Sequence, residues 1–143
     1  MRQWLNRAFY AQKKTQALDL YVKQCRERAQ GLSRNSDGVD KGKSDGAENG
    51  TENALMKLAE MEMQAEEQKI EAINVSAEIQ KAINQLSDDD LEAILIHRYL
   101  LFESVEETAK SIGYDARTVM RKIKKAVEKL SPYVIESHSD NML

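Results

Sequence analysis

One segment decides the fold of this chain: residues 104–130, with the sequence SVEETAKSIGYDARTVMRKIKKAVEKL. Ser104, with Glu107 three residues later, forms a capping box, which predicts a helix that begins at the next residue. Gly113 ends that helix, because a left-handed C-cap brings no Cβ clash for glycine. Asp115 then caps a second helix by accepting the free N–H groups of its first turn. The segment therefore predicts two short helices joined by a tight turn.

The two predicted helices are amphipathic, and the second is strongly basic. Helical spacing gives the first an apolar face, and gives the second an inward face of Val119, Ile123, Ala126, Val127 and Leu130. Residues 115–130 hold six lysines and arginines against two acids, a net charge of +4 in a chain whose total is −3. Ala109 supplies the small residue needed where the helices cross. This pattern is typical of a helix-turn-helix, whose second helix enters the major groove of DNA.

We expect the DNA contacts to come from the outward face of the second helix. Arg117, Thr118 and Arg121 project from its first turns toward base edges, where an arginine pairs with guanine for about 1–3 kcal/mol of discrimination. The lysines further along are expected to hold phosphates and to set affinity and salt dependence: Lys122, Lys124, Lys125 and Lys129. Lys110, on the first helix, adds to this clamp. The alternative is an amphipathic hairpin whose basic face is only solvated.

The segment RYLLFESVEETAKSIGYDARTVMRKIKKAVEKL, residues 98–130, resembles region 4 of sigma-70-type RNA polymerase sigma factors. The likeness covers residues 91–130. The matching positions are Arg98 and Tyr99, Glu107 and Ala109, Gly113 and Tyr114, Thr118 and Val119, Lys122 and Ile123, Lys125 and Ala126, and Lys129 and Leu130. The whole chain resembles small phage-encoded proteins in which a helical N-terminal half is followed by a C-terminal segment like region 4. These proteins are known as late transcriptional regulators of the ArpU/RinA type and as the DUF1492 family.

The resemblance implies a three-helix, winged-helix-like domain in a sequence-specific transcriptional regulator. Such a protein is phage-encoded, lies in the cytoplasm of a bacterial host and acts on bacterial or phage promoters. Its partners are double-stranded DNA and, by the likeness to region 4, RNA polymerase. Asp115 departs from this resemblance, because a serine or threonine is more usual there. Lys122 departs from helix-turn-helix motifs in general, many of which carry an aliphatic residue at this place, and the adjacent Ile123 is expected to take the inward role. Because nothing resembles the sigma region that binds the −10 element, a complete sigma factor is not expected.

Composition limits the remaining classes. The chain has 143 residues, 41% hydrophobic and 31% charged, with one proline and one cysteine. A single cysteine excludes an intramolecular disulfide and a cysteine-rich zinc site. The chain contains no apolar run of membrane-spanning length and no secretory signal, so neither a membrane nor an export route is expected. A net charge of −3 means that DNA binding has to come from a local patch.

Residues 1–32 are predicted to form one long helix with a heptad seam. The seam repeats at spacings of four and three through Trp4, Ala8, Ala11, Thr15, Leu18, Val22, Cys25, Ala29 and Leu32, which indicates coiled-coil packing. The segment 1–30 has seven basic residues against two acids. This excess charge either pairs with an acidic partner helix or adds a second surface for the DNA backbone.

The next segments predict a hairpin. Residues 33–53 are rich in glycine, serine and asparagine, and we expect a flexible loop. A second long helix is predicted from Asn53, as N-cap, to Leu86, with an apolar face and an acidic exposed side. The two helices then form an antiparallel hairpin within the chain, or they pair between chains in a homodimer. The sequence leaves both open.

A support helix is predicted to begin at Ser87, whose capping box includes three acids. His97 stands alone in this helix and carries no metal or catalytic hypothesis. Pro132 is expected to stop the recognition helix, and residues 136–143 are expected to be a disordered tail. No nucleophile, base and oxyanion arrangement is visible, so we expect a protein that is not an enzyme and needs no cofactor.

The sequence thus predicts an all-α protein in three parts. Residues 1–86 form the hairpin or coiled coil, with its loop at 33–53; residues 87–135 form the helix-turn-helix domain; residues 136–143 form the tail. Two other functions stay open. One is a phage DNA-packaging component of the small-terminase type, although its DNA-binding part usually comes first in the chain. The other is a helical interaction protein without DNA binding.

Overall fold

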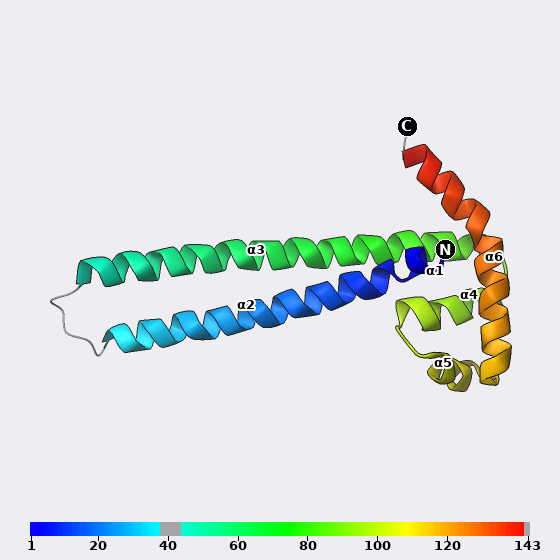
Figure 1. Cartoon of the computed structure of the whole chain (residues 1–143), viewed down its shortest axis with the longest axis horizontal. Coiled ribbons are helices and arrows are strands. Elements are labelled where there is room, and N and C mark those ends of the chain that lie inside the picture. The colour runs from blue at the N-terminus through cyan, green and yellow to red at the C-terminus, as the bar shows by residue number, and fades with distance from the viewer. Residues whose placement is uncertain (38–43, 142–143) are drawn as a thin grey trace. The chain divides into compact units, whose positions relative to one another are not determined.

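The computed structural model describes residues 1–37 and 44–141 of the chain. In this part of the chain every element is helical and no β-strand occurs, which confirms the all-α class. The elements, in chain order (Figure 1), are α1 (Arg2–Leu5), α2 (Arg7–Asp37), α3 (Ser44–Ile83), the 3-10 turn η2 (Asn84–Leu86), α4 (Asp89–Leu95), the π-helical turn η3 (Ile96–Leu100), α5 (Val105–Ile112) and α6 (Ala116–Asn141).

The chain divides into two compact units. The first, which we call the helical cluster, joins Met1–Ala11 to Ala72–Leu143. The second, which we call the hairpin, is Gln12–Glu71 and contains most of α2 and most of α3. This division differs from the boundary expected near residue 86, because the last turns of α3 carry apolar side chains that belong to the core of the cluster.

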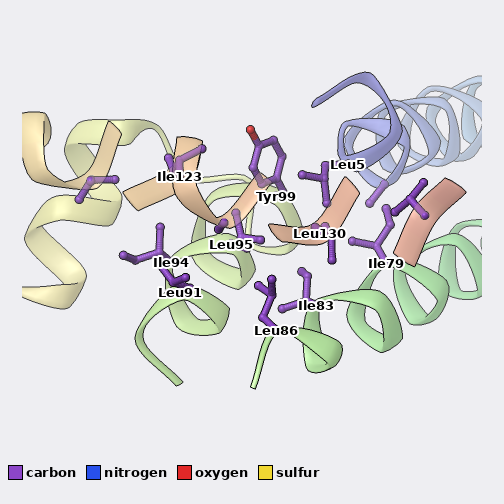
Figure 2. Packing of buried hydrophobic residues seen from close by; sticks show 14 of the residues in the cluster. Leu5, Ile79, Ile83, Leu86, Leu91, Ile94, Leu95, Tyr99, Ile123 and Leu130 are labelled. Atoms are coloured by element: carbon purple, nitrogen blue, oxygen red, sulfur yellow. The ribbon is translucent and has the colours of Figure 1, made fainter. Parts of the chain in front are cut away.

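The core of the helical cluster draws on all its helices. Figure 2 shows Leu5 from α1, Ile79 and Ile83 from α3, and Leu130 from α6 among the side chains that pack together, and each of these four has no exposed surface. Leu91, Ile94 and Leu95 of α4 lie in the same core. The expected support helix is therefore present, and its buried side chains share one core with those of α3 and α6.

The hairpin is an antiparallel pair of helices within one chain. Thr15 donates a hydrogen bond to the carbonyl oxygen of Gln68 over 3.4 Å. Further along, Arg26 contacts Glu62 at 2.9 Å. From the first of these contacts to the second, the residue number rises on α2 and falls on α3, so the two helices run in opposite directions (Figure 1). The predicted seam is confirmed here, since its members are buried or half-buried: Thr15, Leu18, Val22, Cys25 and Ala29.

The first helix is interrupted, in contrast to the single helix expected over residues 1–32. Asn6 lies between α1 and α2, and its N–H bonds back to the carbonyl oxygen of Arg2 over 2.9 Å. The interruption lets Leu5 and Ala8 both enter the core of the cluster, where they are 0% and 1% exposed. Trp4, expected in the heptad seam, packs half-buried against that core instead.

Both long helices extend into the segment expected to be a loop. α2 continues to Asp37, and α3 begins at Ser44 instead of being capped at Asn53. The loop prediction for residues 33–53 is therefore wrong at 33–37 and 44–53, and residues 38–43 lie outside the described part of the chain. An established helix adds one hydrogen bond for each further residue, so it extends through polar residues where no proline stops it.

The last helix also passes the point where it was expected to stop. α6 runs to Asn141 with Pro132 inside it, so the predicted stop is wrong, and the expected disordered tail is helical over residues 136–141. Leu130 and Val134, on either side of the proline, are both buried in the cluster. Their burial holds the helical path across Pro132 although the missing N–H removes one hydrogen bond. Figure 1 shows α6 bending along its length.

Candidate nucleic-acid interface

The geometry of α5, the turn and α6 follows the caps predicted from the sequence. Ser104 caps α5 by accepting a hydrogen bond from the N–H of Glu107 over 3.1 Å. Gly113 ends the helix in the left-handed region, with φ 87°, and its N–H bonds to the carbonyl oxygen of Ala109 over 2.9 Å. A side chain at this φ costs conformational energy, so glycine is required for the backbone. These caps fix where α6 starts.

Asp115 caps α6 as predicted. Its Oδ1 accepts the N–H of Thr118 over 2.9 Å. Hydrogen bonds from the side chain and then the backbone of Thr118 hold the pKa of the Asp115 carboxyl below its usual value. Because the hydroxyl of Thr118 is engaged with the cap, this half-buried residue stabilises the start of the helix in the unbound protein.

The inward face of α6 is buried as the spacing predicts. Val119, Ala126 and Leu130 have no exposed surface, and Ile123 is 4% exposed. Val127 is only half-buried at the edge of the core. Ala109 of α5 is 6% exposed, at the place where a small residue was expected. The orientation of α6 about its own axis is thereby fixed, and its other side faces outward.

That outward side carries most of the predicted DNA contacts. Six of the eight are exposed: Arg117, Arg121, Lys124, Lys125 and Lys129 on α6, and Lys110 on α5. Among the described residues, the side chains of these six make no hydrogen bond and no ion pair. The sequence did not single out Met120, which is 59% exposed on the same side of α6. Its apolar side chain lies among cations, and only its position on the outward face distinguishes it from a core residue.

Lys122 is the exception among the predicted contacts. Its Nζ lies 2.5 Å from Oδ2 of Asp90 on α4 and 4.9 Å from the ring centroid of Tyr114. The hydroxyl of Tyr114 donates to Oδ1 of the same Asp90 over 2.9 Å. We call these three residues the Asp90 clamp. The structure therefore brings Lys122 to the junction of α4 and the turn, apart from the outward cations.

The clamp shifts the pKa values of Asp90 and Lys122, and it explains one of the three acids at the start of α4. The hydrogen bond from Lys122 holds the pKa of Asp90 below its usual value, and the bond from Tyr114 adds to this effect. The same contact raises the pKa of Lys122. The N-cap of α4 is Asp88, which accepts from the N–H groups of Asp90 and Leu91. Ser87 was expected in that role, but it has φ 55° and ends η2 instead.

A second polar cluster fixes the connection between η3 and α5. His97 Nδ1 lies 3.0 Å from Oε2 of Glu103, and Ser111 Oγ donates to the same carboxylate over 3.3 Å to Oε1. Arg98 donates to the carbonyl oxygen of Glu103 over 3.2 Å. Phe102 packs half-buried against the core, with its ring centroid 5.7 Å from that of Phe9. His97 is thus a structural residue of this connection.

The part of the chain that the structure describes contains neither a candidate metal site nor a candidate membrane span. No group of three or more histidine, cysteine, aspartate or glutamate side chains there is arranged to hold a metal ion. No helix there combines the length and the apolar character needed to cross a membrane.

Comparison with known proteins gives one match. The model of the family described as protein of unknown function (DUF1492) matches residues 33–131, which is more than half of the chain. The matched region includes α4, α5 and the first half of α6, and with them every predicted DNA-contact residue. Neither the curated proteins nor the solved structures contain a significant match.

Proposed function

The chain belongs to the DUF1492 family, and we propose that it is a sequence-specific DNA-binding protein that regulates transcription. In this proposal α5 and α6 form a helix-turn-helix, supported by α4, and α6 is the recognition helix. The resemblance of residues 91–130 to region 4 of sigma factors supports this arrangement. The family description names no function, so the proposal depends on the geometry of these helices.

The observation that carries the proposal is the row of exposed cations on α6. Arg117, Arg121 and Lys124 are spaced by four and three residues, so they lie on one side of the helix, and Lys125 is adjacent. They are opposite Val119 and the rest of the buried face. A solvated basic helix usually pairs some of its cations with acids one turn away. The side chains of these four make no hydrogen bond or ion pair among the described residues, although the charge of Arg121 helps to lower the pKa of Asp115, and phosphate oxygens would supply such partners.

In this proposal the contacts with base edges and the contacts with phosphates come from different parts of α6. Arg117 and Arg121 lie nearest the N-terminus of α6, the end that reads base edges in a helix-turn-helix. Met120 lies between them in sequence and offers an apolar contact of the kind that suits a thymine methyl group. Lys124, Lys125, Lys129 and, from α5, Lys110 hold phosphates. Thr118 contacts DNA only if its hydrogen bond to Asp115 is exchanged or shared.

The test is fluorescence anisotropy with mixed duplex DNA across a series of salt concentrations. The wild type should bind, with an affinity that falls steeply as salt rises. The Arg121→Ala/Lys125→Ala double variant should bind more weakly and should lower the slope of log K against log salt by about 1–2, since each phosphate contact contributes about 0.9.

A matched control removes the same charge from another place. Lys57 and Lys81 are exposed on α3, and the Lys57→Ala/Lys81→Ala variant has the same net charge as the double variant on α6. It should bind like the wild type. Equal losses in both double variants would mean that net charge alone governs binding. Absence of binding by the wild type at low salt would leave α6 as a solvated basic face and would favour a helical interaction protein.

We also propose the origin, partners and oligomeric state that the sequence leads us to expect. Phage origin, action at promoters in a bacterial cytoplasm and contact with RNA polymerase follow from the resemblance to region 4. A homodimer through the hairpin would bring two recognition helices to paired half-sites. Sedimentation velocity separates the cases: a monomer or dimer fits the regulator, whereas a ring-sized oligomer would favour the DNA-packaging alternative. We also propose that the protein has no enzymatic activity.

A further inference from the structure

We propose that Lys122 is a positioning residue, which sets the angle of α6 on α4 through the Asp90 clamp and does not itself hold DNA. The inference rests on the proposed function, because one of the two measurements that test it is the affinity for DNA. It separates one lysine of the basic helix from its neighbours, although the sequence gives all of them the same chemistry.

The geometry of the clamp engages Lys122 on two sides. The carboxylate of Asp90 lies 2.5 Å from its Nζ, and the face of the Tyr114 ring lies 4.9 Å from it. The side chains of Lys122 and Asp90 are 30% and 34% exposed, so both are partly withdrawn from water. An ammonium group that reached out to a phosphate would give up the ion pair and the cation–π contact together.

The clamp joins three separate parts of the cluster. Asp90 lies in the first turn of α4, Tyr114 in the turn between α5 and α6, and Lys122 two turns into α6. Apolar packing by Val119 and Ile123 fixes which side of α6 is buried, but a row of aliphatic contacts permits sliding along the helix axis. A charged pair with one short distance restricts that sliding. The position of Arg117 and Arg121 relative to the rest of the domain therefore depends on Lys122.

The departure of Lys122 from the aliphatic residue usual at this position of a helix-turn-helix now has a physical explanation. Its partner is on α4, thirty-two residues earlier in the chain. Asp88, the N-cap of α4, adds a second negative charge that favours the ammonium form of Lys122. Two of the three acids at the start of α4 thus have separate roles, since Asp88 caps the helix and Asp90 binds α6.

The test uses three variants of the full chain. Lys122→Met removes the charge and keeps most of the apolar length. Lys125→Met makes the same change at an exposed lysine of the same helix and is the matched control. The exchange variant Asp90→Lys/Lys122→Asp keeps the net charge and restores an ion pair with the opposite orientation. Urea unfolding measures how much the clamp stabilises the fold. Fluorescence anisotropy with DNA, across salt concentrations at which every variant is folded, measures how well α6 is positioned for binding.

Positioning by Lys122 gives a distinct pattern. Lys122→Met should lower the urea midpoint and raise the Kd for DNA several-fold, while the slope of log K against log salt stays at the wild-type value. Lys125→Met should keep the midpoint and lower that slope by about 0.9. The exchange variant should recover a large part of both the midpoint and the affinity that Lys122→Met loses.

Two results would overturn the inference. A Lys122→Met variant with an unchanged urea midpoint and a lower salt slope would make Lys122 a phosphate contact like Lys125. An exchange variant that recovers the midpoint but binds DNA more weakly than Lys122→Met would also mean direct contact, because it places an acid at the DNA. If the wild type binds no DNA, the proposed function fails, and the unfolding measurements still decide whether the clamp joins α4 to α6.

Discussion

The helical cluster and the hairpin bury their apolar residues to very different extents. The cluster has fully buried side chains from α1, α3, α4 and α6, among them Leu5, Ile83 and Leu130. Among the described residues of the hairpin, only Thr15, Val22 and Ala65 are buried. Six large apolar side chains among the described residues of the hairpin are more than half exposed: Leu20, Tyr21, Leu55, Met56, Met63 and Ile70.

The difference follows from the number of elements that meet. Two helices hide only the seam between them, whereas helices that cross from several directions enclose side chains on all sides. Local stability follows buried apolar contacts, so we expect the hairpin to open more readily than the cluster. The predicted DNA contacts all lie on the cluster, on α5 and α6. A recognition helix needs such a firm base, because its side chains have to meet base edges within hydrogen-bond distance.

The largest expected effect is a core truncation in the cluster. Leu130 has no exposed surface, and Leu130→Ala should lower the free energy of unfolding by about 2–5 kcal/mol, through lost burial and the cavity left behind. Val22→Ala in the hairpin should cost about 1–2 kcal/mol. Urea unfolding followed by circular dichroism measures both. Equal losses at the two positions would contradict the contrast between the units.

The next effect concerns the turn that places α6. Gly113→Ala puts a Cβ at φ 87°, where no other atom lies within 4 Å, so the cost is backbone strain without a clash. We expect a loss of about 1–2 kcal/mol in the free energy of unfolding. Gly31→Ala, inside α2 and with equal space around it, is the control and should be neutral or stabilising. A neutral Gly113→Ala would mean that the turn does not need the left-handed conformation.

A stabilising substitution is expected at Thr108. Its side chain is fully buried in α5, and among the described residues its Oγ1 has no hydrogen-bond partner. Thr108→Val keeps the shape and removes the unsatisfied hydroxyl, so the free energy of unfolding should rise by about 1 kcal/mol. Thr108→Ser keeps the hydroxyl, loses a methyl group and should be destabilising. Destabilisation by valine would mean that the hydroxyl has a partner, such as a buried water.

The ion pair of the cluster gives a smaller effect with a defined pH dependence. Asp90→Asn should cost up to about 1 kcal/mol at neutral pH, as a partly exposed pair does. Because the pKa of Asp90 is lowered in the folded protein, its contribution is present above about pH 4 and is lost as the pH falls through that lowered pKa. Urea midpoints of wild type and variant should converge in acid. A difference that persists there would assign the effect to packing.

The smallest effect is expected at the surface of the hairpin. The side chains of Arg26 and Glu62 pair at 2.9 Å, but they are 51% and 42% exposed. Glu62→Gln should change the free energy of unfolding by only about 0.2–1 kcal/mol, and the change should shrink in high salt. A loss as large as that of Leu130→Ala would show that ion pairs, and not the seam, hold the hairpin together.

Local signals in the sequence were sufficient where one residue determines one backbone feature. Ser104, Gly113 and Asp115 define the ends of α5 and the start of α6, because each acts on neighbours within four residues. The heptad seam of the hairpin was predictable for the same reason. The Asp90 clamp was not, since its partners are far apart in sequence and only the packing of α4 on α6 brings them together. Local composition also gave the wrong result at residues 44–53 and at Pro132, where helices continue through unfavourable residues.

The central claim is that the outward side of α6 meets DNA, and a chemical-shift titration tests it most directly. At 16.3 kDa the chain is small enough for amide spectra of the full-length protein during addition of duplex DNA. We predict that the largest shifts fall at Arg117, Arg121 and Lys125, with little change at the hairpin residues Met56 and Met63. Shifts concentrated on the basic residues of α2, or none at any DNA concentration, would contradict the claim.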